Sequence, residues 1–174
     1  MYLTEPETDM HTRRNLLLGT GAVALTSAAA YLALNSESEA AEGTFEVELA
    51  PAEWRDRLTE EEYAVLREEA TEAPFSSPLN EEQRAGIFTC GGCGQDVYSS
   101  ETKFMSGTGW PSFWDNLEGA VGTKTDYKLI YPRTEVHCSR CGGHLGHIFE
   151  DGPEPTGLRH CLNGVALDFR AEAV

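Results

Sequence analysis

Lysine is scarce in this chain of 174 residues, so a strongly cationic surface is excluded. Only Lys103, Lys124 and Lys128 are present, and 13 lysine and arginine residues stand against 29 aspartate and glutamate residues, which gives a net charge of −16. Nonspecific binding to a phosphate backbone needs positive charge, so we expect no nucleic-acid partner. We interpret the excess of carboxylates as an adaptation to high salt, which screens their mutual repulsion.

Sequence signatures of two large protein classes are also missing. The sequence has no internal repeat and no glycine-rich phosphate-binding motif, which argues against a repeat protein and against a P-loop protein. The hydrophobic fraction of 40% is that of a globular protein with a core. A chain of 174 residues accommodates one domain and a modest extension.

Residues 1–42 form the first predicted unit, a twin-arginine signal or anchor segment with an acidic linker. Arg13 and Arg14 precede the apolar stretch 16–34, whose 19 residues include no charge. A single membrane helix is the alternative, because this length just spans a bilayer. Glycine, serine and threonine make the stretch weakly hydrophobic, which favours export. We expect an extracytoplasmic protein, either secreted or held at the membrane only through this segment, whose cleavage is left open.

Residues 43–174 form the second predicted unit, a metal-binding domain. Thr59 and Glu62 match a capping box, and apolar residues at helical spacing behind them predict an amphipathic helix over 59–70. Short β-prone runs separated by glycines then predict strands at 87–89, 96–98, 127–131, 134–136, 148–149 and 165–169. We therefore expect a small, mostly antiparallel β domain.

Four of the five cysteine residues form two Cys-x-x-Cys-Gly motifs: Cys90, Cys93, Cys138 and Cys141. Two such motifs supply four thiolates for tetrahedral coordination, so the spacing predicts one structural Zn²⁺ per chain. Two redox dithiols or two disulfides are the alternatives. A thioredoxin-type motif opens a helix in a βαβ unit, and neither motif here has that setting. A closed shell of four cysteines leaves no open coordination position, so we expect this metal to hold the fold.

The fifth cysteine, Cys161, stands apart from these motifs. A lone cysteine is more often a small buried hydrophobic residue than a nucleophile. Arg159 and Asn163, however, lie two residues away on either side, on the same face of a predicted strand. A neighbouring guanidinium favours the reactive thiolate. His144 and His147 are available for proton transfer, because four cysteines already complete a zinc shell.

Three long runs, 106–113, 144–153 and 155–164, resemble the B type of methionine-R-sulfoxide reductase. Together with shorter matches, the resemblance extends over about residues 54–169. It implies a mostly β, β-tent-like fold of two antiparallel sheets with a few short helices and a structural zinc site on the four paired cysteines. It also implies an oxidoreductase that acts on oxidised methionine in proteins or peptides, with free methionine sulfoxide left open as a substrate.

The resemblance further implies individual roles. Cys161 is the nucleophile that becomes a sulfenic acid, while the two histidines and Asn163 hydrogen-bond the sulfoxide oxygen. The implied catalytic residues are Cys161, His144, His147, Asn163, Arg159 and Asp151. The implied substrate-binding residues are Trp110, Phe113, Thr108 and Ser112. An aromatic wall for the S-methyl group and donors for the oxygen together accept only one epimer at sulfur.

Two positions depart from the family pattern. Thr108 stands where many members carry a resolving cysteine, and the chain has no other spare thiol. We therefore expect Cys161 to be regenerated by an external, thioredoxin-like thiol donor on the outer side of the membrane. Separately, we expect the chain to be a monomer. His160 stands where an aromatic residue is usual and adds a titratable group beside the nucleophile.

Two rival functions remain. A zinc-ribbon interaction module without catalysis explains the cysteine motifs but leaves Cys161 and its neighbours idle. A thiol enzyme acting on small molecules such as glutathione adducts would share the fold, but it has no need of the aromatic run 110–113 as a wall for a methyl group.

Overall fold

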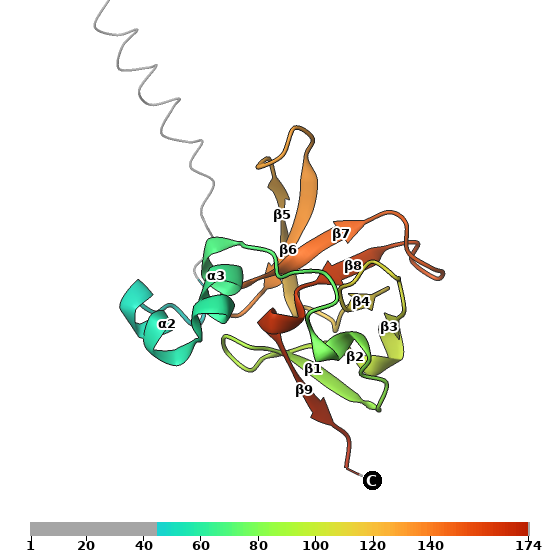
Figure 1. Ribbon diagram of the computed structural model, residues 1–174, viewed down its shortest axis with the longest axis horizontal. Helices are drawn as coiled ribbons and strands as arrows, with labels where there is room; N and C mark the ends of the chain where they lie inside the picture. Colours follow the sequence, from blue (N-terminus) through green and yellow to red (C-terminus); the bar gives the residue numbers. More distant parts are fainter. Residues whose placement is uncertain (1–44, 174) are drawn as a thin grey trace, which may run out of the picture. The chain divides into compact units, whose positions relative to one another are not determined.

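The computed structural model describes residues 45–173, which form two antiparallel sheets and a pair of short helices (Figure 1). The predicted signal segment and linker, 1–42, lie outside the described residues. Within 45–173, no helix has the length and apolar character that a membrane span requires. The mostly β architecture expected from the sequence is confirmed.

The described helices and strands alternate with short connections along the chain. In order they are α2 (Pro51–Arg57), α3 (Glu60–Glu68), η1 (Pro78–Asn80), β1 (Gly86–Cys90), β2 (Asp96–Ser99), η2 (Ser100–Thr102), β3 (Lys103–Phe104), β4 (Ser112–Phe113), β5 (Val121–Asp126), β6 (Arg133–Cys138), β7 (His144–Phe149), β8 (Arg159–Leu162), η3 (Gly164–Ala166) and β9 (Leu167–Ala171), where η denotes a 3₁₀ turn.

The helix α3 begins where the capping box predicts. The Thr59 hydroxyl accepts a hydrogen bond from the Glu62 N–H at 3.2 Å, and the Glu62 carboxylate accepts one from the Thr59 N–H at 2.7 Å. The buried face of α3 carries Val65 and Leu66 and packs against β7 and η3. No sequence pattern predicted α2, in which Trp54 is the buried residue.

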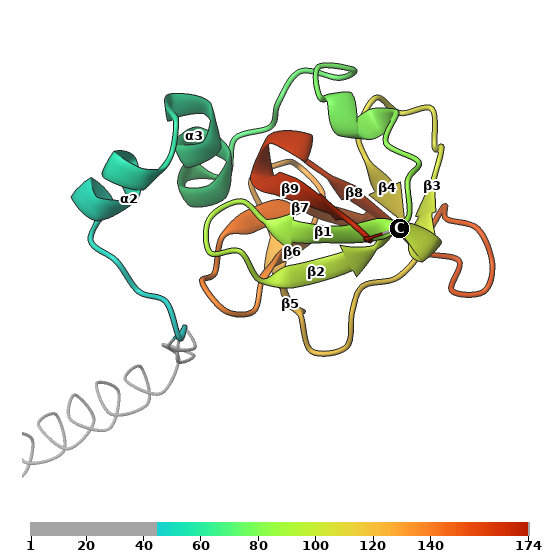
Figure 2. The same cartoon turned by 90° about the horizontal axis from the view of Figure 1, so that it is seen from below.

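Two sheets meet around one core. The smaller sheet has the order β2-β1-β9, and the larger one has the order β3-β4-β8-β7-β6-β5. Figure 2 shows β1 and β2 of the smaller sheet lying across the strands of the larger one. The link from β8 through η3 to β9 carries the chain from one sheet directly into the other.

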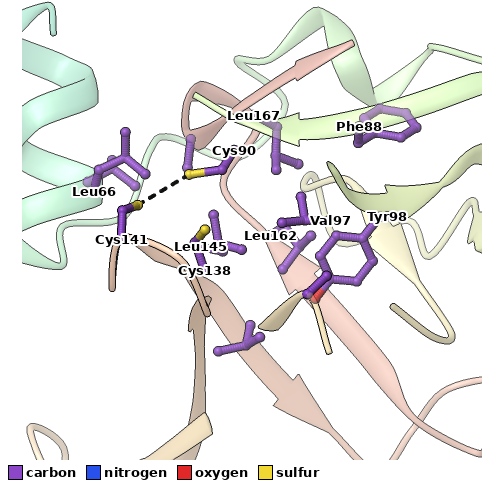
Figure 3. Packing of buried hydrophobic residues seen from close by; sticks show 14 of the residues in the cluster. Leu66, Phe88, Cys90, Val97, Tyr98, Cys138, Cys141, Leu145, Leu162 and Leu167 are labelled. Atoms are coloured by element: carbon purple, nitrogen blue, oxygen red, sulfur yellow. Dashed lines mark hydrogen bonds between the residues drawn. The ribbon is translucent and has the colours of Figure 1, made fainter. Parts of the chain in front are cut away.

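Aromatic rings fill one end of the core, and cysteine thiols lie at the other (Figure 3). Phe88 of β1 contacts Phe113 of β4, with ring centroids 4.9 Å apart, and also Phe169 of β9 at 4.9 Å. Tyr98 of β2 packs on Phe113 at 4.6 Å. Phe88, Tyr98 and Phe113 are all fully buried, so these rings join the two sheets.

The strand predicted at 127–131 is wrong. Pairing between β5 and β6 ends at Asp126 and Arg133, which face each other across the two strands. Asp126 also accepts a hydrogen bond from the Lys128 N–H at 2.8 Å, and this turns the chain out of the sheet. The apolar residues 127–131 therefore belong to an exposed loop, and the strand precedes them. Similarly, η3 takes the first part of the predicted strand 165–169.

Replacement of Phe88 by alanine tests whether the aromatic contacts join the sheets. We expect Phe88→Ala to lower the free energy of unfolding by about 3–5 kcal/mol, because it leaves a cavity where three rings meet. Denaturant unfolding of the purified protein measures this. Ile130→Ala, at a fully exposed position, is the matched control and should change the stability by less than about 0.5 kcal/mol. Equal effects of the two substitutions would contradict this account of the core.

Candidate active site and metal centre

The four cysteines of the two Cys-x-x-Cys motifs converge on one point between the sheets. Their sulfur atoms all lie within 4.8 Å of one another. The Sγ atoms of Cys90 and Cys141 are 3.7 Å apart, and those of Cys93 and Cys138 are 3.6 Å apart. A tetrahedral site with metal–sulfur bonds of about 2.3 Å has sulfur–sulfur distances of about 3.8 Å. A disulfide needs about 2.05 Å. The cluster therefore fits a single tetrahedral metal ion.

The glycine after each cysteine pair makes the required turn. Gly94 and Gly142 have φ of 72° and 68°, in the left-handed region. Their N–H groups donate to the carbonyl oxygens of Cys90 and Cys138, at 2.7 and 2.9 Å. Each motif is thereby folded back so that both of its thiols face the same point.

Strand register brings the lone cysteine and a histidine together. Cys161 on β8 lies directly opposite His147 on β7 and opposite Ser112 on β4. Directly opposed residues of antiparallel strands project on the same face, with their Cβ atoms about 4.5–5.5 Å apart. The larger sheet therefore presents a thiol beside an imidazole.

A pocket of about 140 Å³ opens at this position. Its lining combines groups of different chemistry: a thiol, an imidazole, an amide and two aromatic rings. The lining residues are Thr71, Trp110, Arg133, Gly146, His147, Phe149, Cys161, Leu162 and Asn163. Its size suits a group of a few heavy atoms. Four of the predicted site residues, Trp110, His147, Cys161 and Asn163, share this pocket.

His147 is held by a buried carboxylate that the sequence analysis did not single out. Its Nε2–H donates to Asp126 Oδ2 at 2.8 Å, and Arg133 donates to the same oxygen. The Lys128 N–H and then His147 lower the pKa of Asp126 well below its usual range, so this carboxylate is an acceptor only. Burial lowers the pKa of His147, although Asp126 opposes the shift. His147 is therefore neutral near pH 7, with Nδ1 left to meet a ligand.

His144 lies behind His147, outside the residues that line the pocket. The two ring centroids are 5.3 Å apart, and His144 is buried. Its Nδ1 lies 2.7 Å from Glu135 Oε1, and its Nε2 has no hydrogen-bond partner among the described residues. Burial would raise the pKa of Glu135, but hydrogen bonds from His137 and His144 outweigh that effect and hold it at about 2. The carboxylate therefore fixes the His144 ring and leaves one nitrogen free.

Cys161 is a partly buried thiol. Burial raises its pKa, while Thr108, whose Oγ1 lies 3.8 Å from the Cys161 Sγ, and the nearby Arg159 guanidinium act in the opposite direction. Arg159 thus favours the thiolate, as expected, but burial is the larger effect. In the free protein, Cys161 is protonated at neutral pH.

Asp151 acts on Arg159 rather than on the pocket. Its exposed carboxylate accepts two hydrogen bonds from the Arg159 guanidinium, at 2.8 and 2.9 Å. The guanidinium also lies 4.5 Å from the centre of the Phe149 ring, which forms part of the pocket wall. Asp151 and Arg159 therefore fix the position of that wall.

Glu72 joins two sides of the pocket. Its backbone N–H donates to the Asn163 side-chain oxygen at 3.0 Å, and its carbonyl oxygen accepts from the Trp110 indole at 3.2 Å. Its buried carboxylate accepts hydrogen bonds from the N–H groups of Gly164 and Val165, at 2.6 and 2.9 Å. One residue therefore positions both the amide and the indole.

Several predicted site residues lie outside the pocket. Phe113 is fully buried in the aromatic core, and Ser112 is buried, with its hydroxyl 2.7 Å from the Ser106 hydroxyl. His160 alternates with Cys161 along β8 and points into the core, where its Nδ1 lies 2.9 Å from the Tyr98 hydroxyl. His160 is therefore next to Cys161 in sequence but on the opposite face of the sheet.

Sequence reasoning missed the residues that hold the pocket in place: Glu72, Asp126, Arg133 and Glu135. Signals were present for three of them. Asp126 and Arg133 carry opposite charges at the two ends of the run 127–132, which is apolar except for Lys128. Glu135 is a charged residue within a β-prone run, which is unusual for a buried strand. No local signal marks Glu72, whose partners lie about 90 residues away in sequence.

Comparison with known proteins identifies the family. The model of the SelR domain matches residues 58–171. The chain belongs to the SelR domain family. Relatives named peptide methionine sulfoxide reductase MsrB include one from Methanosarcina barkeri (strain Fusaro / DSM 804), 53% identical over 127 residues, 72% of this chain and 89% of that protein. Another, from Leptospira interrogans, is 45% identical over 129 residues, 74% of this chain and 98% of that protein.

Membership of the SelR family confirms the predicted resemblance and the oxidoreductase class. Among solved structures, the Mis18 'Yippee-like' domain is similar to 52% of this chain and 100% of that domain, with 18% identity and a TM-score of 0.41. A likeness of this degree has no bearing on the function.

The protonation state of Cys161 can be measured by alkylation. Because burial raises its pKa, we expect the rate with iodoacetamide to rise about tenfold per pH unit from pH 7 to 9, following the thiolate fraction. Mass spectrometry of the zinc-loaded chain assigns the modified residue. Arg159→Met should slow the reaction at each pH, because it removes the positive charge that favours the thiolate. An alkylation rate that does not change between pH 7 and pH 9 would show that Cys161 is already a thiolate at pH 7 and would contradict the raised pKa.

Proposed function

We propose that the protein reduces methionine-R-sulfoxide in proteins and peptides to methionine, with Cys161 as the nucleophile. The family supports the reaction class. The observation that carries the proposal is the pairing of Cys161 with His147 across β7 and β8, in a pocket that also contains Trp110 and Asn163. This pocket offers a nucleophile, a proton carrier and an apolar wall to one small group.

The proposed reaction transfers one oxygen atom between two sulfur atoms. The Cys161 sulfur attacks the sulfoxide sulfur, the sulfur–oxygen bond of the substrate breaks, and the oxygen ends on Cys161 as a sulfenic acid. The thiol proton ends on that oxygen, and methionine leaves. A neutral His147 next to a protonated Cys161 suits this balance, because the imidazole can accept the thiol proton and deliver it to the sulfoxide oxygen.

The shape of the pocket accounts for the expected stereospecificity. Trp110 provides a polarizable surface for the S-methyl group, while His147 and Asn163 provide hydrogen-bonding groups for the oxygen. Only the R epimer presents its methyl group and its oxygen to these two sides at once. His144 supports His147 from behind, and Asp151 acts through Arg159.

The sulfenic acid is then reduced by an external thiol. Thr108, rather than a cysteine, is next to Cys161, and the remaining four cysteines belong to the metal cluster. A donor thiol condenses with the sulfenic acid and releases water, and a second thiol reduces the mixed disulfide to restore Cys161. The proposed donor is a thioredoxin-like protein.

The four-cysteine cluster is proposed to hold one zinc ion. All of its coordination positions are supplied by the chain, so the ion would stabilise the junction of the two sheets. The chain is further proposed to be a monomer, exported by the twin-arginine route, with contact to the membrane only through its N-terminal segment and no nucleic-acid partner.

Turnover of separate sulfoxide epimers tests the activity and the nucleophile. We expect the full-length, zinc-loaded chain in high salt with dithiothreitol to reduce the R epimer of a peptide methionine sulfoxide and not the S epimer. Cys161→Ser should abolish turnover, because an alcohol cannot form the sulfenic acid. Dimedone should trap that acid on Cys161 when substrate is added without reductant.

Two results would contradict this proposal. Failure of a folded, metal-loaded sample to reduce either epimer would favour a zinc-ribbon interaction module, whereas full activity of Cys161→Ser would refute Cys161 as the nucleophile. An intramolecular disulfide to Cys161 after turnover of a metal-replete sample would exclude the external-thiol step alone.

Metal analysis tests the zinc proposal with a matched pair of variants. We expect one zinc per chain, and we expect Cys138→Ser to lose both the metal and the cooperative thermal unfolding transition. Structural zinc contributes on the order of 10 kcal/mol or more in small domains, comparable with the whole stability of a domain. Cys161→Ser makes the same chemical change outside the cluster and should retain both. A stable, metal-free Cys138→Ser protein would contradict a structural role.

A further inference from the structure

The loop between β5 and β6 exposes an unusual set of apolar side chains. Tyr127, Ile130 and Tyr131 are 75%, 105% and 61% exposed, and Leu129 is 48% exposed. Figure 1 shows that the hairpin of β5 and β6 extends away from the other strands. Large apolar residues gathered at one exposed site typically mark an interaction surface.

A groove of about 430 Å³ begins at the base of this loop. It lies where β6 begins, β7 ends and the chain enters β8. Its apolar walls are formed by Tyr131, Ile148, Phe149 and Leu158. This volume falls in the range of sites that bind a whole side chain or a small ligand.

The groove adjoins the pocket of Cys161. Phe149 and Arg133 line both hollows. Each is held in place: Arg133 forms an ion pair with Asp126, and the Phe149 ring lies against the guanidinium of Arg159. The wall between the groove and the pocket is therefore held in a defined position by these two contacts.

We propose that this groove binds an apolar side chain next to the oxidised methionine in a polypeptide substrate. The inference rests on the proposed function, because a methionine sulfoxide in the pocket is what anchors the polypeptide there. An extended chain advances about 3.3–3.6 Å per residue. Because the pocket and the groove share Phe149 and Arg133, a residue adjacent to that methionine is within reach of the groove.

The charge around the groove favours apolar over acidic neighbours. Arg133 is already neutralised by Asp126, Glu150 adds a negative charge to the lining, and the whole chain carries −16. The groove therefore suits leucine, isoleucine, valine or phenylalanine beside the methionine better than aspartate or glutamate.

Peptide turnover with dithiothreitol tests the groove without a donor protein. Three R-sulfoxide substrates are compared: one flanked by leucine on both sides, one flanked by aspartate, and N-acetylmethionine sulfoxide methylamide. We expect kcat/KM for the leucine peptide to exceed that for the aspartate peptide by about 5- to 20-fold, as burial of one apolar side chain allows. Tyr131→Ser should remove most of this preference through KM and leave the minimal substrate unaffected.

Ile130→Ser is the matched control, because it removes a neighbouring apolar side chain that does not line the groove. Equal leucine and aspartate rates in the unmodified protein, with the minimal substrate still reduced, would overturn this inference and leave the proposed function intact. No turnover of any substrate would instead refute the proposed function. A Tyr131→Ser defect that appears only when thioredoxin replaces dithiothreitol would assign the groove to the donor and overturn its assignment to substrate.

Discussion

The convergence of four thiols between the two sheets is the constraint on which the rest of the structure depends. Cys90 ends β1 of the smaller sheet, and Cys138 ends β6 of the larger sheet, so one small cluster connects the two sheets at the end of the core opposite the aromatic rings. Four thiolates this close together would repel one another and lose their hydration on burial, so a cation is needed to hold them in the ionised form. The position of the cluster thus suits a cation bound between the two sheets.

The second constraint acts on the pocket, where side chains that would contact a ligand are held in place by residues that do not contact it. Asp126 holds His147, and Glu72 holds both Trp110 and Asn163. Such supports remove rotamer freedom before a ligand arrives, and this is how a shallow pocket can be selective. The supports come from elements distant in sequence, so the folding of the whole domain is what sets the positions of the pocket groups.

The sequence was most informative where structure is local or where a motif has one chemical explanation. The capping box located α3, and the paired Cys-x-x-Cys-Gly motifs located the metal cluster, because spacing alone determines both. The apolar run 127–131 misled because its β-prone residues form a loop, and only the pairing of Asp126 with Arg133 shows where the strand ends. Phe113 and His160 lie within recognisable motifs, yet strand alternation turns them into the core. The roles of the supporting carboxylates could not be predicted, because only the tertiary fold brings their partners near.

Glu72 has a consequence for attempts to redesign the pocket. Its backbone contacts the indole on one side and the amide on the other, while its carboxylate is anchored to the turn that follows β8. The two walls therefore behave as one mechanical unit, and a change that moves one to admit a bulkier sulfoxide also displaces the other. Substitution of Thr71 or Phe149 is a better way to enlarge the site, because both residues line the pocket and neither takes part in these hydrogen bonds.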